Sequence, residues 1–97
     1  MIVIEYDKSS IKLRGHANYA PAGQDIVCAG VSVLIQTLIQ SVETLTADEI
    51  EYSMQPGAVD IKFWCISDLT RALISAFFIG IKGIAEAYPK NVKLTER

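Results

Sequence analysis

The chain has 97 residues and a formal net charge of −2 at neutral pH, and 51% of its residues are hydrophobic. This length predicts a single domain over residues 1–97, and so small a domain has only a marginal core. The high apolar content therefore favours a homodimer, in which a second copy covers part of the apolar surface. Lysine and arginine are scattered along the chain, which argues against direct binding of nucleic acid or of an anionic membrane.

The N-terminal segment reads as a β-hairpin. Residues 2–6 form an apolar run, residues 7–10 have turn chemistry, and residues 11–15 alternate between apolar and polar side chains. The segment lacks the charged region and the cleavage site of a secretory signal, and the two cysteines, Cys28 and Cys65, do not form a disulfide framework. We therefore expect a cytoplasmic protein with free thiols.

A long apolar stretch follows a loop that contains Pro21 and Gly23. Asp25 is the predicted N-cap of a helix that runs to about Glu43, because its carboxylate can accept hydrogen bonds from the first-turn amides. Apolar residues cover most of the helix circumference, which predicts a helix that is central or lies at an interface. Polar side chains interrupt residues 26–42 and the run 72–81 is short, so we expect neither to cross a membrane, which takes about 20 apolar residues.

The second half of the chain has the same order of elements as the first. Residues 48–54 and 59–65 alternate around Pro56-Gly57, a pair typical of a type II turn, and they predict a second hairpin. Positions 59, 61, 63 and 65 share one face of the second strand, so Cys65 is expected in the core.

The C-terminal part is predicted to be a helix and a short strand. Ser67 and Asp68 are candidate caps for a helix from residue 69 to about Tyr88, where Pro89 stops it, and residues 91–95 alternate as a last strand. The order ββαββαβ predicts an α+β fold (α/β two-layer), with a mostly antiparallel sheet of about five strands packed against two helices.

The strongest candidates for chemistry are Cys28, near the start of the first predicted helix, and His16, at the end of the preceding strand. The positive end of the helix dipole favours a thiolate there, and unpaired first-turn amides can receive a developing oxyanion. Imidazole exchanges protons near neutral pH, so His16 is the candidate general acid and base. From spacing alone, a purely structural cysteine in an apolar helix is the commoner case.

Asp25 and Ser32 are the local groups that could orient the imidazole, and Ser32 lies one helical turn after Cys28. For Asp25 the N-cap role is the commoner one, and the two roles are compatible. His16, Asp25, Cys28 and Cys65 could also supply four metal ligands, but none of them has the spacing typical of a zinc site. We therefore expect no metal and no cofactor.

Two motifs carry a resemblance to a known family. The run Gly15-His16-Ala17, joined through a short loop with Gly23 to Asp25-Ile26-Val27-Cys28-Ala29-Gly30-Val31-Ser32, resembles the ribosomal-processing cysteine protease family, often called Prp. The run Ile84-Ala85-Glu86-Ala87-Tyr88-Pro89, followed by Val92, is similar to the C-terminal pattern of that family. The resemblance extends over essentially the whole chain.

The resemblance implies a small homodimeric enzyme with Cys28 as nucleophile and His16 as base, supported by Asp25 and Ser32. It implies a cysteine endopeptidase that removes a short N-terminal extension from a large-subunit ribosomal protein, after an aromatic residue, in support of ribosome assembly. It also implies a mobile substrate loop that closes over the peptide, formed here by Ala17, Asn18, Tyr19, Ala20, Pro21, Ala22, Gly23 and Gln24.

Two other functions remain open at this point. A non-catalytic, ribosome-associated module of the same fold would bind a peptide or protein without cutting it, and a Cys28→Ala change would leave its function intact. An RNA-binding assembly factor would need a basic stripe, which the chain lacks. Both sequence motifs are intact, which favours the endopeptidase.

Overall fold

The computed structural model describes residues 1–97 and has the predicted order of elements. The strands are β1 (Ile2–Tyr6), β2 (Ser10–Arg14), β3 (Ile50–Gln55), β4 (Ala58–Phe63) and β5 (Val92–Glu96), and the helices are α1 (Ile26–Leu45) and α2 (Asp68–Ala87). The α+β class and the order ββαββαβ are therefore confirmed.

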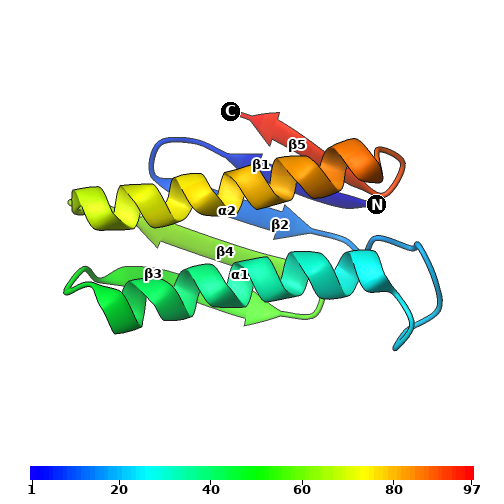
Figure 1. Cartoon of the computed structure of the whole chain (residues 1–97), viewed down its shortest axis with the longest axis horizontal. Helices are drawn as coiled ribbons and strands as arrows, with labels where there is room; N and C mark the ends of the chain where they lie inside the picture. The colour runs from blue at the N-terminus through cyan, green and yellow to red at the C-terminus, as the bar shows by residue number, and fades with distance from the viewer.

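The five strands form one mixed sheet in the order β3-β4-β2-β1-β5. The hairpins β1–β2 and β3–β4 are antiparallel, β2 pairs antiparallel with β4, and β5 runs parallel to β1. Both helices cover the same face of the sheet (Figure 1). Because β2 lies beside β4, the segment that follows β2 reaches the turn between β3 and β4, and this neighbourhood becomes the site described below.

The core lies between the sheet and the helix layer. Alternate residues of the inner strands are buried, as the period of two predicts, and they meet one face of each helix. From the strands the core takes Ile2, Ile4, Ile11, Leu13, Val59, Ile61, Phe63 and Val92, and from the helices Val27, Val31, Ile35, Leu38, Ile39, Val42, Phe77 and Ile81.

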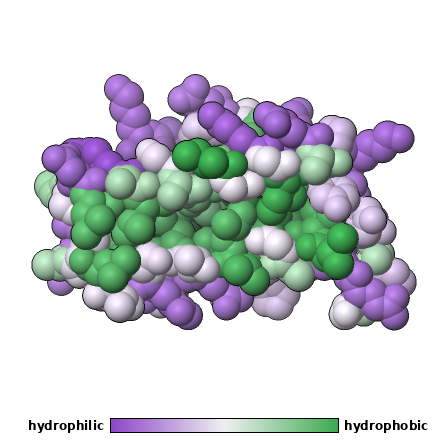
Figure 2. All heavy atoms as spheres, viewed as in Figure 1, coloured by the Kyte–Doolittle hydropathy of each residue, from purple (hydrophilic) through white to green (hydrophobic).

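The helix layer leaves an apolar outer face. On α1, Ile26 and Val33 are 59% and 62% exposed, and on α2 Ile79 is 75% exposed. Apolar residues gather over this layer in the space-filling view (Figure 2). The first helix is thus not central, and its predicted place at an interface stays a prediction.

Two predictions about the apolar segments need comment. Helix α1 continues to Leu45 and by length and composition alone is long and apolar enough to cross a membrane, so the inference from length is wrong; the core helices of soluble proteins pass the same criterion, and the expectation that α1 does not cross a membrane stays a prediction. Strand β4 ends at Phe63, and Cys65 has φ +51° and is exposed, not part of the core. The chain turns there to enter α2, so the alternation of β4 no longer applies at that position.

Candidate active site

Cys28 is the third residue of α1, as the position of the N-cap predicted. Asp25 is that N-cap, and its Oδ1 accepts hydrogen bonds from the N–H groups of Val27 and Cys28, at 3.0 and 2.9 Å. The cap fixes the first turn and holds the half-buried thiol where the chain enters from the loop. The structure therefore places Cys28 at the helix N-terminus, close to the end of β2.

The Asp25 carboxylate also organises the loop before the helix. Its Oδ2 accepts from the N–H groups of Tyr19, at 2.9 Å, and Ala20, at 3.4 Å. The N–H of Cys28 above all, with the other three donors, holds the pKa of Asp25 below its ordinary value, although partial burial opposes this. Because Asp25 occupies two first-turn amides, the prediction that these amides are free for an oxyanion is wrong for Val27 and Cys28.

The sulfur of Cys28 has a hydrogen-bond donor outside the helix. The N–H of Ala17 lies 3.2 Å from Cys28 Sγ, and Ala17 is buried. An N–H that points at sulfur stabilises the thiolate more than the thiol. Because Ala17 directly follows His16, this contact also brings the chain that carries the imidazole next to the thiol.

His16 lies against the turn between β3 and β4. The N–H of Gly15 donates to the carbonyl of Gly57, at 2.9 Å, which joins the end of β2 to this turn. Gly57 has φ +71°, and a methyl group there would lie 2.8 Å from His16 Nε2. The imidazole thus packs against the backbone of Gly57, which has no side chain. No hydrogen bond joins the imidazole to Asp25 or to Ser32.

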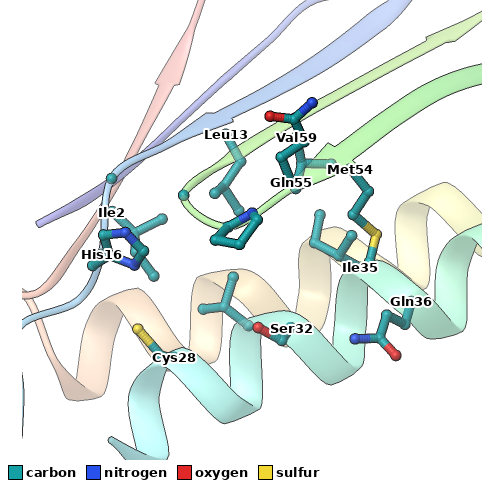
Figure 3. Close-up of a pocket in the computed structure, with 14 residues that line it drawn as sticks. Ile2, Leu13, His16, Cys28, Ser32, Ile35, Gln36, Met54, Gln55 and Val59 are labelled. Atoms are coloured by element: carbon teal, nitrogen blue, oxygen red, sulfur yellow. The ribbon is translucent and has the colours of Figure 1, made fainter. Parts of the chain in front are cut away.

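Two hollows meet at His16 and Cys28, the candidate catalytic dyad. The first, of about 420 Å³, runs from His16 and Cys28 between α1 and the β3–β4 turn, where Met54 and Gln36 line its far end (Figure 3). The second, of about 550 Å³, lies on the loop side, between the dyad and residues such as Asn18 and Ala22. His16, Cys28 and Ser32 line both hollows. An extended chain that crosses the dyad would therefore find a recess on each side of it.

The predicted substrate loop, residues 17–24, forms one wall of the second hollow. It is held by the Asp25 carboxylate and by an edge-to-face contact between the rings of Tyr19 and Tyr88, with centroids 5.3 Å apart. A turn bond from the Gln24 N–H to the Pro21 carbonyl closes its tip. The closing motion implied for this loop stays a prediction.

The four residues considered as metal ligands are not gathered in one place. Cys65 follows the far end of β4, whereas His16 lies beside the other end of that strand. No group of three or more His, Cys, Asp or Glu side chains is placed to hold a metal ion.

Sequence reasoning missed two contributors to the site. Gly57 was identified as a turn residue, but its contact with His16 depends on the order of strands in the sheet. Asn91, just before β5, donates from Nδ2 to the Ala17 carbonyl at 2.9 Å. The only signal near it was the Tyr88-Pro89 motif, whose function the sequence did not reveal.

Comparisons with known proteins show the family of the chain. The family described as Cysteine protease Prp matches residues 1–93 of the chain. A ribosomal processing cysteine protease Prp from Mycoplasma genitalium is 29% identical over 98 residues, which cover 99% of this chain and 96% of the relative.

Solved structures show the same fold. The essential ribosomal processing protease Prp from S. aureus, in complex with a covalently linked product peptide, superposes with a TM-score of 0.96 at 22% identity, over 100% of both chains. A crystal structure of a Streptococcus mutans protein is 30% identical, with a TM-score of 0.78, and the match covers 99% of this chain and 93% of that one.

Proposed function

The chain belongs to the cysteine protease Prp family and is a cysteine peptidase, and we propose that it is an endopeptidase that removes a short N-terminal extension from a large-subunit ribosomal protein. Cys28 is the nucleophile of this proposal and His16 the general acid and base. The observation that carries it is the position of Cys28 Sγ, 3.2 Å from the Ala17 N–H at the junction of two hollows that His16 also lines.

The chemistry proceeds in two steps. The Cys28 thiolate adds to the scissile carbonyl carbon, so that a C–S bond forms and the carbonyl π electrons move to oxygen. When the oxyanion collapses, the C–N bond breaks and the His16 imidazolium gives its proton to the leaving amine, which leaves a thioester on Cys28. Water, deprotonated by His16, then attacks the thioester carbonyl, and the C–S bond breaks as the tetrahedral intermediate collapses. The new carboxylic acid gives its proton to solvent, and the Cys28 thiolate and the His16 imidazolium are restored for the next turnover.

The substrate is a flexible N-terminal segment cut after an aromatic residue, as the family resemblance implies. The S. aureus relative has been captured with a substrate peptide and with a covalently linked product peptide. The hollow beside the dyad offers apolar walls from Leu13, Val31, Ile35 and Met54, which suit an apolar or aromatic side chain.

The enzyme acts in the cytoplasm as one domain and as a homodimer. The apolar outer face of α1 and α2, with Ile26, Val33 and Ile79 largely exposed, supports the dimer. The acidic charge balance and the free thiols are consistent with this location.

The test is cleavage of a peptide that copies the N-terminal extension of the ribosomal protein. Wild type should cut it after the aromatic residue, and Cys28→Ala, Cys28→Ser and His16→Ala should lose activity by at least about a thousandfold while they stay folded. The matched control is Cys65→Ala, which removes the exposed thiol at the far end of β4 and should cut at the wild-type rate. Tight binding without cleavage by wild type would contradict the proposal and favour a binding module.

A further inference from the structure

The N–H, the carbonyl and the side chain of Ala17 are each fixed by a different contact. Its N–H donates to Cys28 Sγ at 3.2 Å, its carbonyl accepts from Asn91 Nδ2 at 2.9 Å, and its side chain is part of the core, 1% exposed. Asn91 comes from the opposite end of the sequence. The peptide group before Ala17 is therefore held by Cys28, across the short loop, and the one after it by Asn91, near the C-terminal end of the chain.

The Ala17 N–H supports a thiolate on Cys28 where the N-terminus of α1 alone does not suffice. The Asp25 carboxylate takes the amides of Val27 and Cys28, and its negative charge offsets the positive end of the helix dipole. Both effects weaken the support that the α1 N-terminus gives to a thiolate on Cys28. The amide of Ala17 is the one backbone donor that points at the sulfur itself.

Asn91 is well placed to fix this donor, because its own backbone is anchored. Its N–H donates to the Tyr88 carbonyl and its carbonyl accepts from the Ile2 N–H, both at 2.9 Å. Tyr88 in turn packs edge-to-face on Tyr19 of the substrate loop. The short segment 88–91 thus contacts the loop through a ring and the Ala17 peptide through an amide.

From these contacts we infer that Asn91 is a positioning residue of the peptidase, which holds the Ala17 N–H on the Cys28 sulfur and thereby stabilises the thiolate. The inference rests on the proposed role of Cys28 as nucleophile. Asn91 acts through Ala17 and does not itself contact the sulfur, and the conformation of the same peptide also sets where His16 emerges. This gives the C-terminal Tyr88-Pro89 motif and the residues after it a function at the active site.

The test compares Asn91→Ala and the isosteric Asn91→Asp with Lys90→Ala, an exposed neighbour with no side-chain hydrogen bond. All are made in a Cys65→Ser background, so that Cys28 is the only thiol. The rate of alkylation by iodoacetamide is measured against pH, together with kcat and KM on the peptide and with thermal melting. The alkylation profile needs no peptide substrate, so it stays informative if the proposed substrate is wrong.

Both Asn91 variants should move the alkylation profile toward higher pH, because the thiolate loses a well-aimed donor. They should lower kcat roughly tenfold, with KM within about twofold. Lys90→Ala should match the background in every measurement. A shifted profile without cleavage by any variant would remove the proposed substrate but keep the role of Asn91, whereas an unshifted profile in both Asn91 variants would overturn that role whatever happens to cleavage.

A measurement on the Cys65→Ser protein with Asn91 intact covers the case in which both Asn91 variants unfold. The Ala17 amide proton, followed by NMR as Cys28 ionises, should move more than any other amide of residues 15–20. A static Ala17 signal would contradict the inference without any substitution at position 91.

Discussion

At the scale of single residues, the site depends on a glycine that makes room for the imidazole. Gly57→Ala would place a methyl group 2.8 Å from His16 Nε2 and would force an alanine to φ +71°. We expect kcat to fall roughly tenfold to a hundredfold, because a small displacement of a catalytic group is costly, while the strain lowers the free energy of unfolding by only about 1 kcal/mol. Peptide cleavage and urea denaturation measure the two effects.

The matched control for Gly57 is Gly83→Ala, because Gly83 lies in α2 with nothing within 4 Å of an added methyl group. This change should raise the free energy of unfolding by about 0.5–1 kcal/mol and leave kcat unchanged. Wild-type activity in Gly57→Ala would show that the turn does not position His16.

The carboxylate of Asp25 makes stability depend on pH in a defined direction. Because its N–H donors, Cys28 first, lower its pKa from the ordinary 3.8, Asp25 stabilises the fold above about pH 4, and this contribution disappears as pH falls through the lowered value. Asp25→Asn should therefore unfold at lower urea concentration than wild type at pH 7, and the difference should shrink steadily below about pH 4.

The control for this series is Glu43→Gln, which changes an exposed carboxylate that accepts no hydrogen bond and forms no ion pair in the structure. It should follow wild type at each pH. A stability difference for Asp25→Asn that persists undiminished at pH 2 would contradict the assigned cause.

At the scale of elements, a separate polar cluster stabilises the end of the helix layer that lies away from the site, where α1 ends and α2 begins. Asp48, between α1 and β3, accepts from the Ser67 N–H and Oγ at 2.9 and 2.6 Å and from the hydroxyl of fully buried Thr70. The donor groups, the Ser67 hydroxyl first, lower the pKa of Asp48. The cluster joins the start of α2 to the end of α1 without contact to Cys28 or His16.

Thr70→Val tests that separation of roles, because it removes the hydroxyl and keeps the shape. It should lower the free energy of unfolding by about 1 kcal/mol, since Asp48 loses a donor, and leave kcat and KM unchanged. Thr44→Val, at an exposed position of α1, is the matched control and should change stability very little. A loss of kcat in Thr70→Val would show that the two ends of the helix layer are coupled.

The elements also show what a sequence alone can predict here. The caps Asp25 and Ser67 and the Pro56-Gly57 turn were predictable because each is local chemistry, and the structure confirms them. The proximity of His16 and Cys28 was also predictable, because only a short loop separates them in the chain. The contacts of Gly57 and Asn91 with the site could not be predicted, because they depend on β4 lying beside β2 and on β5 lying beside β1.

At the scale of the whole molecule, the apolar outer face of the helix layer is the proposed dimer surface. A Val33→Glu, Ile79→Glu double variant should shift the protein from dimer to monomer in light scattering, because a carboxylate is costly to bury in an apolar interface. Both residues are largely exposed in the single chain, so the monomer should keep its fold. A dimer of unchanged strength would place the interface on another face.

The control for the dimer surface is Thr95→Glu, which adds a negative charge on the exposed side of β5, away from the helices. It should remain dimeric. If wild type is itself monomeric at micromolar concentration, the proposal of a homodimer is wrong, and the apolar face needs another explanation.

The measurement that tests the central claim most directly is the mass of the enzyme during turnover. Rapid acid quenching of wild type with the peptide, followed by intact mass and peptide mapping, should reveal a thioester that joins the N-terminal part of the peptide to Cys28, and Cys28→Ala should show none. A peptide that is cut equally well by Cys28→Ala, or an adduct found on Cys65, would contradict the account of Cys28 as the nucleophile.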